Sequence, residues 1–286
     1  MNSVRHNNQS SNYYMTIDDT VILWDWFNQR VKIWGNQKIS KNTLQFIKTL
    51  ANNAAIGKIV ACTLPAYQEM FLEQGFVVEG KISGFFSGKD AQVYSHFTSP
   101  ARGTSDNKYD VIVPVGSNWD RVKETIEQTS FPCITRKATP ADVPGMISLF
   151  RDVFKTYPSP VFDSDYLLGC MEYGRVTYRV AIDANNQIVG IASAEQDPAN
   201  LNAEITDCVT DPQFRGQGVL SRIIGELEAD LYREGYICLY TLCRATHAPV
   251  NKAFFRLGYV FTGRLIKNCN ICGSYEDMNV LVKVLR

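Results

Sequence analysis

The order of apolar and polar residues along the chain predicts a mixture of strands and helices in both halves. Residues 58–63 and 204–210 are short runs rich in β-branched and apolar side chains, which favours buried strands. From Val219 onward, apolar residues recur every three or four positions, which favours a helix with one buried face. The pattern therefore indicates an α/β (α+β) protein with a mixed sheet flanked by helices.

The same pattern of apolar and polar residues predicts the order of strands and helices along the whole chain. Strands are predicted at residues 20–25, 30–34, 58–63, 76–82, 91–97, 110–115, 133–137, 175–182, 187–196, 204–210, 236–242, 259–267 and 277–285. Helices are predicted at residues 41–54, 66–74, 119–129, 140–154, 163–173, 219–233 and 248–257. We expect the polar residues 1–12 to be disordered, and residues 130–132 to separate an N-terminal domain (13–132) from a C-terminal domain (133–286).

A pair of glycines lies between the strand at 204–210 and the helix that follows it. Pro212 ends the strand, and Gly216 and Gly218 permit a tight turn without a Cβ atom in the way. Loop amides beside a helix N-terminus form a site for an anion. The spacing differs from the dinucleotide fingerprint and from the nucleotide P-loop. An ordinary turn that binds nothing is the alternative reading.

Composition narrows the classes of protein that fit. The 286 residues suffice for one large or two modest domains, and Lys plus Arg balances Asp plus Glu at 29 each. Zero net charge argues against a general nucleic-acid or anionic-membrane binder. No apolar run is long enough to span a bilayer, and the N-terminus has no apolar signal core, so we expect a cytoplasmic location.

The eight cysteines are scattered through apolar runs, which is typical of buried free thiols in a reducing compartment. Cys269 and Cys272 form a C-x-x-C pair in a predicted hairpin, but no second pair or histidine partners stand at zinc-site spacing. A structural or incidental role is expected for them, and no metal site is predicted.

The chain also carries an internal repeat. Residues 71–76 (Phe-Leu-Glu-Gln-Gly-Phe) mirror residues 254–259 (Phe-Phe-Arg-Leu-Gly-Tyr) at an offset of 183, which persists to Gly80 and Gly263. The first half is therefore predicted to be a degenerate copy of the second that lacks the glycine loop. We expect one active site per chain, with the first half shaping its substrate cleft. Chance recurrence of helix–glycine–strand junctions is the alternative.

The glycine loop, the helix end at 254–259 and the element order resemble the GNAT superfamily of N-acetyltransferases. Further motifs, at residues 71–76, 84–90, 244–247, 263–268 and 278–280, resemble the β-lysine Nε-acetyltransferase family, although Leu281 replaces a frequent Trp. The resemblance implies acetyl-CoA as co-substrate and the ε-amine of β-lysine as acceptor, giving a neutral osmolyte. It leaves open another small amine (a polyamine or an aminoglycoside), a protein lysine, an inactive acyl-CoA-binding module, and a homodimer.

The resemblance also implies which residues contact the cofactor. The implied CoA-binding residues are Cys208, Val209, Thr210, Gln213, Phe214, Arg215, Gly216, Gln217, Gly218, Val219, Asn251 and Phe254. Many family members carry, at the position of Phe254, a tyrosine that protonates the leaving thiolate. That acid is absent here, and Tyr259 and Tyr240 are the remaining candidates.

An alkyl ammonium must lose a proton before it can attack a thioester, and a carboxylate can accept that proton. Glu204 lies where several family members carry this base. Strand alternation predicts that Asp207, three residues on, points to the opposite face, so that only one of the two faces the cleft. The remaining substrate-binding candidates are Glu195, Glu276 and Asp277 for an ammonium, Arg179 and Arg244 for a carboxylate, and Phe85 and Phe86 as lining residues. Surface ion pairs and core packing are the alternative roles for these residues.

Overall fold

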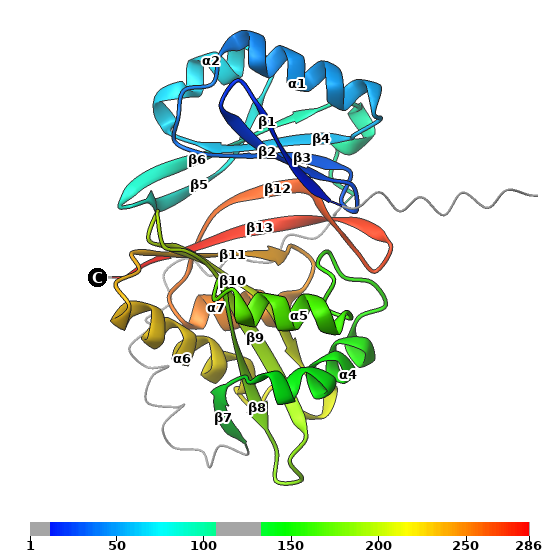
Figure 1. Cartoon of the computed structure of the whole chain (residues 1–286), viewed down its shortest axis with the longest axis vertical. Helices are drawn as coiled ribbons and strands as arrows, with labels where there is room; N and C mark the ends of the chain where they lie inside the picture. Colours follow the sequence, from blue (N-terminus) through cyan, green and yellow to red (C-terminus); the bar gives the residue numbers. More distant parts are fainter. Residues whose placement is uncertain (1–11, 107–132, 286) are drawn as a thin grey trace, which may run out of the picture.

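The computed structural model describes residues 12–106 and 133–285. Its strands form a single sheet, in the order β1-β2-β3-β4-β6-β5-β12-β13-β11-β10-β9-β8-β7 (Figure 1). The N-terminal half contains β1 (Tyr13–Ile17), β2 (Thr20–Asp25), β3 (Arg30–Trp34), α1 (Lys41–Asn53), β4 (Lys58–Thr63), α2 (Gln68–Glu73), β5 (Val77–Phe86) and β6 (Lys89–Phe97). The C-terminal half contains β7 (Ile134–Lys137), α4 (Val143–Val153), α5 (Ser164–Glu172), β8 (Val176–Ile182), β9 (Ile188–Asp197), β10 (Asn202–Thr210), α6 (Val219–Arg233), β11 (Cys238–Arg244), α7 (Ala248–Arg256), β12 (Val260–Ile271) and β13 (Ser274–Val284).

Most predicted elements are present, and the mixed sheet flanked by helices is confirmed. The strand β1 was not predicted. The hairpin of β12 and β13 is longer than expected, because both strands continue to a turn at Cys272 and Gly273. The predicted disorder of residues 1–11, strand at 110–115, helix at 119–129 and boundary at 130–132 lie outside the described residues. Asn12 is ordered, since its side chain binds Asp25 and the amide of Trp26.

The two halves meet at a pair of glycines in the middle of the sheet. Strand β5 pairs with β12 at Gly80 and Gly263, the two positions that end the internal repeat. A Cβ atom at Gly263 would lie 2.2 Å from the carbonyl oxygen of Glu79 and 2.3 Å from the Cα of Gly80. Only glycine therefore fits at residue 263 without moving backbone.

The contact at Gly263 predicts a large loss of stability for Gly263→Ala. The added methyl group meets backbone atoms, which cannot rotate away as a side chain could, so we expect a loss of about 3 kcal/mol in unfolding free energy. Urea unfolding followed by tryptophan fluorescence measures this. Gly35→Ala is the matched control, because a Cβ there meets nothing within 4 Å. Equal unfolding midpoints for the two variants would contradict the close approach.

The halves present the same elements in the same order outward from this junction. The N-terminal order is β5, β6, β4, β3, β2, β1, and the C-terminal order is β12, β13, β11, β10, β9, β8. In each half the fourth strand is parallel to the third, and a helix connects the two. Ser40 caps the start of α1, because its Oγ accepts a hydrogen bond from the amide of Thr43. In contrast, α6 begins after Gly218 with no side-chain cap. This order is what a duplicated unit predicts.

Each half has its own apolar packing, and a shared layer lies between them. Helices α6 and α7 cover one face of the C-terminal strands, and α4 and α5 cover part of the other. Between the halves, side chains from both pack into one cluster that includes Val60, Phe85, Tyr240 and Val280. The N-terminal half is thereby stacked on the C-terminal half (Figure 1). Within the described ranges, no helix is long and apolar enough to cross a membrane.

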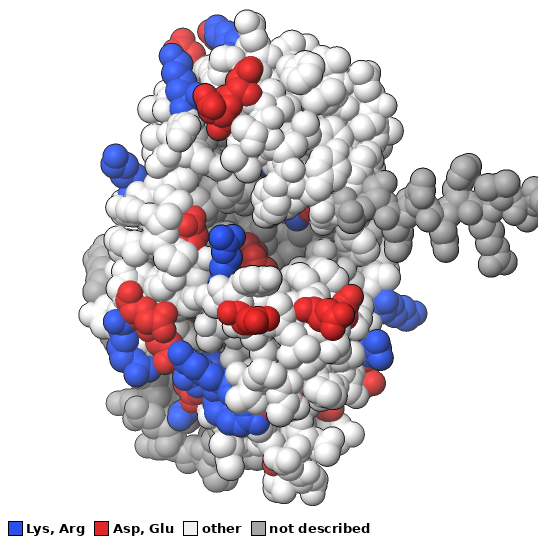
Figure 2. Space-filling model, viewed as in Figure 1, with Lys and Arg blue, Asp and Glu red and all other residues white. Residues whose placement is uncertain are grey.

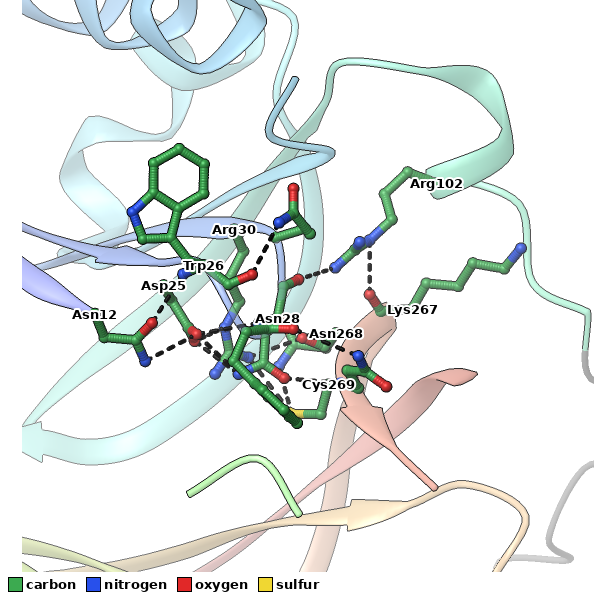
Figure 3. Close-up of polar contacts among 12 residues, drawn as sticks. Asn12, Asp25, Trp26, Asn28, Arg30, Arg102, Lys267, Asn268 and Cys269 are labelled. Atoms are coloured by element: carbon green, nitrogen blue, oxygen red, sulfur yellow. Dashed lines mark hydrogen bonds and ion pairs between the residues drawn. The ribbon is translucent and has the colours of Figure 1, made fainter. Parts of the chain in front are cut away.

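A buried polar network fixes the β2–β3 hairpin to β12 (Figure 3). The Arg30 guanidinium donates to Asp25 at 2.8 Å and to the carbonyl of Asn268 at 2.9 Å. Arg102 donates to the carbonyls of Asn28 at 2.6 Å and Lys267 at 2.9 Å. Because these buried groups form hydrogen bonds with one another, they hold β3 in a defined position over the C-terminal half.

The C-x-x-C pair belongs to this junction and its adjoining turn. The buried Cys269 thiol accepts a hydrogen bond from Arg30 at 3.4 Å, while Cys272 lies exposed at the hairpin turn. The arrangement agrees with the expected structural role of Cys269.

Candidate active site

Three carboxylates gather on β9 and β10, on the sheet face that looks toward the N-terminal half. Glu195 and Glu204 are directly opposite each other in the antiparallel ladder, so their side chains share one face. Asp207 lies further along β10 and is buried. The sequence predicted Glu195 and Glu204 as site residues, and the structure brings them together.

The orientation predicted for Asp207 is wrong. The ladder between β9 and β10 shifts register between Thr206 and Val209, and Asp207 has a positive φ of 49°. This bulge inserts an extra residue and turns the Asp207 side chain back to the face of Glu204. There its carboxylate accepts hydrogen bonds from Ser193 Oγ at 2.9 Å and the Tyr178 hydroxyl at 3.3 Å.

The protein environment makes these carboxylates unusually basic. Burial, reinforced by the charge of Glu195, raises the pKa of Glu204 to about 7 and that of Asp207 to about 7. Burial also raises the pKa of Glu195. A carboxylate that titrates near neutral pH can accept a proton from an amine and still be ionised in the resting protein.

The three carboxylates differ in their access to solvent. Glu195 is exposed, Glu204 is half-buried and Asp207 is buried. Nearby protein raises the pKa of Glu195, although part of its side chain is exposed to water. A side chain meets both conditions when it lines a narrow cleft. Figure 2 shows the molecule hollowed between the two halves on the face in view, with acidic and basic side chains in and around the hollow.

The buried Asp207 predicts a specific pH dependence of stability. Its pKa is raised on folding, so its contribution to stability is present at low pH and is lost as the pH rises through about 7. Asp207→Asn should therefore increase the unfolding free energy by about 2 kcal/mol near pH 8.5 and change it little near pH 4.5. Urea titrations at both pH values measure this. Asp152→Asn, on the exposed surface of α4, is the control; an equal effect of Asp207→Asn at both pH values would contradict the prediction.

Four tyrosines surround the carboxylates, and only Tyr240 was considered from the sequence. Tyr240 on β11 is buried and is the ladder partner of Glu204, whose pKa its hydroxyl lowers. Tyr178 on β8 donates to Asp207, and Tyr157, after α4, lies beside the same carboxylate. Tyr166 on α5 is within electrostatic range of Asp207. Aromatic faces and carboxylates together form an environment suited to an ammonium group.

The N-terminal half contributes a cation to the same region. Lys32 on β3 is half-buried, with its Nζ 4.1 Å from the centre of the Trp34 ring. Burial and the neighbouring Arg30 charge lower the pKa of Lys32, whereas Glu204 and Glu195 act in the opposite direction. No local pattern in the sequence indicates that Lys32 lies near Glu204 and Glu195, because the fold brings together strands that are far apart in the chain.

Strands β10 and β11 separate beside the carboxylates. Their parallel pairing is confined to Asn202, Ala203 and Glu204, while β10 continues to pair with β9 as far as Thr210. The other edge of β10, from Ile205 to Thr210, has no strand partner among the described residues. The predicted residues Cys208, Val209 and Thr210 form this open edge, whose backbone groups are available to an extended ligand.

The glycine loop lies next to the open edge. Gly216 and Gly218 have positive φ angles of 79° and 81°, and Gln213, Arg215 and Gln217 are exposed. Within the part of the chain that the structure describes, no hydrogen bond is recorded from the backbone amides of residues 216–219. These amides and the uncapped start of α6 form a site for a diphosphate, with Arg215 as an added positive charge.

Two residues predicted to bind the cofactor are internal instead. The Asn251 amide donates to the carbonyls of Arg244 and His247 and accepts from Asn279, so its hydrogen bonds are used within the protein. Phe254 is fully buried between α7 and the sheet, where it packs edge-on against Tyr259. The α7 residues therefore stabilise the fold, and Tyr259, buried in the same core, is not in the cleft.

The predicted carboxylate-binding arginines are also engaged elsewhere. Arg179 points to the opposite face of the sheet, where it pairs with Glu226 and Asp230 of α6. Arg244 pairs with Glu276 at 3.1 Å. These ion pairs, rather than substrate contacts, account for both arginines.

The remaining candidates have internal roles as well. Asp277 is buried and accepts from the amide of Lys267 at 2.8 Å. Phe85 and Phe86 are buried in the layer between the halves, where Phe85 packs 5.4 Å from the ring of Tyr240. Phe85 thus supports a residue of the site instead of lining it.

Comparisons with known proteins agree with this geometry. The acetyltransferase (GNAT) family profile matches residues 144–259. A β-lysine N6-acetyltransferase of Methanosarcina mazei is 36% identical, over 84% of this chain and 95% of that protein. The N-acetyltransferase YodP of Bacillus subtilis is 30% identical, over 93% and 96%, and a β-lysine N6-acetyltransferase of Methanococcus maripaludis is 27% identical, over 94% and 97%. The chain therefore belongs to the acetyltransferase (GNAT) family and is an acetyl-CoA-dependent N-acetyltransferase.

Proposed function

We propose that this protein transfers an acetyl group from acetyl-CoA to the ε-amine of β-lysine. The observation that carries the proposal is the cluster of Glu195, Glu204 and Asp207 beside the separation of β10 and β11. It places proton acceptors and ammonium partners next to an open strand edge. The two relatives named as β-lysine N6-acetyltransferases support the choice of acceptor.

Glu204 is the proposed general base. An alkyl ammonium has a pKa of about 10.4, so it must lose its proton to become a nucleophile. Glu204 is half-buried, whereas Asp207 is buried and already accepts two hydrogen bonds. Glu204 also stands at the last paired position before the strands separate. It can therefore receive a proton directly or through one water molecule.

Glu195 and Asp207 are the proposed partners of the substrate's positive charge. β-Lysine carries two ammonium groups and one carboxylate at neutral pH. Asp207 and Glu195 supply negative charge, and the surrounding tyrosines supply aromatic faces. A purely apolar cleft would leave these ammonium groups without partners, at a high desolvation cost.

The glycine loop and the open edge of β10 are the proposed acetyl-CoA site. The amides of residues 216–219 would hold the diphosphate, and residues 205–210 would pair with the extended pantetheine arm. Acetyl-CoA supplies the acetyl group. A backbone amide at the bulge near Asp207 would polarise the thioester carbonyl, since the bulge frees amides from the ladder.

A panel of amines tests the proposal. Purified protein with acetyl-CoA is given β-lysine, L-lysine, spermidine, an aminoglycoside or a lysine peptide, and free thiol is measured. We expect the highest kcat/KM with β-lysine. Higher kcat/KM with spermidine or a peptide would replace the proposed acceptor, and no thiol release with any amine would overturn the proposed function.

A further inference from the structure

Lys32 and Glu204 occupy corresponding positions in the two halves of the protein. In the parallel ladder of β3 and β4, the third pair is Lys32 with Val60. In the parallel ladder of β10 and β11, the third pair is Glu204 with Tyr240. The two ladders stand at equal distances from the central β5–β12 junction in the strand order. The N-terminal half thus carries a lysine where the C-terminal half carries the proposed base.

The two positions face the same cleft. Glu204, Glu195 and Asp25 are the carboxylates that act electrostatically on Lys32. Two of them, Glu204 and Glu195, lie on β10 and β9, far from β3 in the strand order. Val60 and Tyr240, the ladder partners of Lys32 and Glu204, pack in the same apolar cluster between the halves. The lysine therefore lies across the cleft from the carboxylates.

Lys32 has no ion-pair partner within 4.0 Å among the residues that the structure describes, and its ammonium lies over the ring of Trp34 at 4.1 Å. The neighbouring cation Arg30 is fully engaged with Asp25, Asn268 and Cys269. Arg30 cannot leave these contacts without exposing a buried carboxylate. Lys32 is thus the basic side chain of β3 that remains available to a ligand.

We propose that Lys32 binds the carboxylate of the acceptor, so that the N-terminal half selects an amino acid with a distal amine over a diamine that lacks a carboxylate. This inference rests on the proposed function, because it assumes that the amine is acetylated beside Glu204. When its carboxylate is bound at Lys32, such an acceptor extends its distal amine toward Glu204, on the opposite side of the cleft. A substrate with ammonium groups only would leave Lys32 unpaired and would be repelled by it.

The test compares β-lysine with 1,4-diaminopentane, the same carbon chain without the carboxylate. Lys32→Met keeps the length and apolar stem of the side chain and removes its charge. We expect kcat/KM for β-lysine to fall by about tenfold to a hundredfold, mainly through KM, and kcat/KM for 1,4-diaminopentane to stay equal or rise. Lys32→Arg should restore the preference for β-lysine, because it restores the charge. Lys38→Met, exposed in the same half, is the matched control and should behave as wild type.

The outcomes separate this inference from the function on which it rests. If Lys32→Met lowers kcat/KM equally for both amines, or lowers neither, the assignment of Lys32 is overturned while the proposed function stands. If the wild-type protein releases no thiol with either amine, the proposed function is overturned and the inference with it. Circular dichroism of Lys32→Met distinguishes a folded variant with altered preference from a misfolded one, which would lose both activities together.

Discussion

Replacing Glu204 with Gln is expected to lower kcat by about 10²- to 10⁴-fold near neutral pH. The amide keeps the size of the side chain but cannot accept the proton of the substrate ammonium. Because the pKa of Glu204 is about 7, kcat/KM of the wild-type protein should rise with pH through about 7, as the carboxylate becomes ionised. In Glu204→Gln this rise should disappear from the residual activity. Initial rates of thiol release between about pH 5.5 and pH 9 measure both effects.

The control for Glu204→Gln is Glu172→Gln, at the exposed end of α5. It should leave kcat and its pH profile unchanged. Acetyl-CoA affinity of Glu204→Gln should also be close to that of the wild type, since the proposed acetyl-CoA site, residues 205–210 and 216–219, does not include Glu204. An unaltered kcat with an unaltered pH profile would place the base elsewhere, with Glu195 as the next carboxylate to test.

Gly216→Asp is expected to weaken the binding of CoA by about a hundredfold or more. Two effects combine. A residue with a Cβ atom is strained at φ 79°, by roughly 1–2 kcal/mol, and a carboxylate beside the diphosphate adds repulsion in a site built from amide donors. Isothermal titration calorimetry with CoA measures the change.

Gly216→Ala separates these two effects, because it shares the backbone strain and adds no charge. It should weaken CoA binding by about tenfold. Both changes should lower the unfolding free energy by no more than this backbone strain, roughly 1–2 kcal/mol, since a Cβ at Gly216 meets nothing within 4 Å. If Gly216→Asp binds CoA as tightly as the wild type, the loop does not hold the diphosphate.

Local patterns in the sequence predicted much of the fold and the cofactor site. The period of apolar residues after Val219 identified α6, and the glycine pair identified its open start, because both depend on neighbours in the chain. The offset between Gly80 and Gly263 anticipated the symmetric strand order. These two glycines prove to contact each other at the junction of the halves.

The acceptor site could not be predicted to the same extent, because it depends on irregular backbone and on distant contacts. The alternation rule failed at Asp207, where a bulge adds one residue to β10. The sequence made Arg179 a candidate to bind the substrate carboxylate. In the fold it pairs instead with Glu226 and Asp230 of α6. Lys32 lies 172 positions before Glu204 and stands in an ordinary strand pattern. Only the three-dimensional fold shows that Lys32 and Glu204 face one cleft.

The proposed function requires that the protein acetylates one particular amine of β-lysine, the ε-amine. The most direct measurement is nuclear magnetic resonance of the product formed from wild-type protein, acetyl-CoA and β-lysine. We expect a single monoacetylated product, whose new amide proton couples to the terminal methylene that carries the ε-nitrogen. A product acetylated on the β-amine, or recovery of unmodified β-lysine with CoA still acetylated, would contradict it.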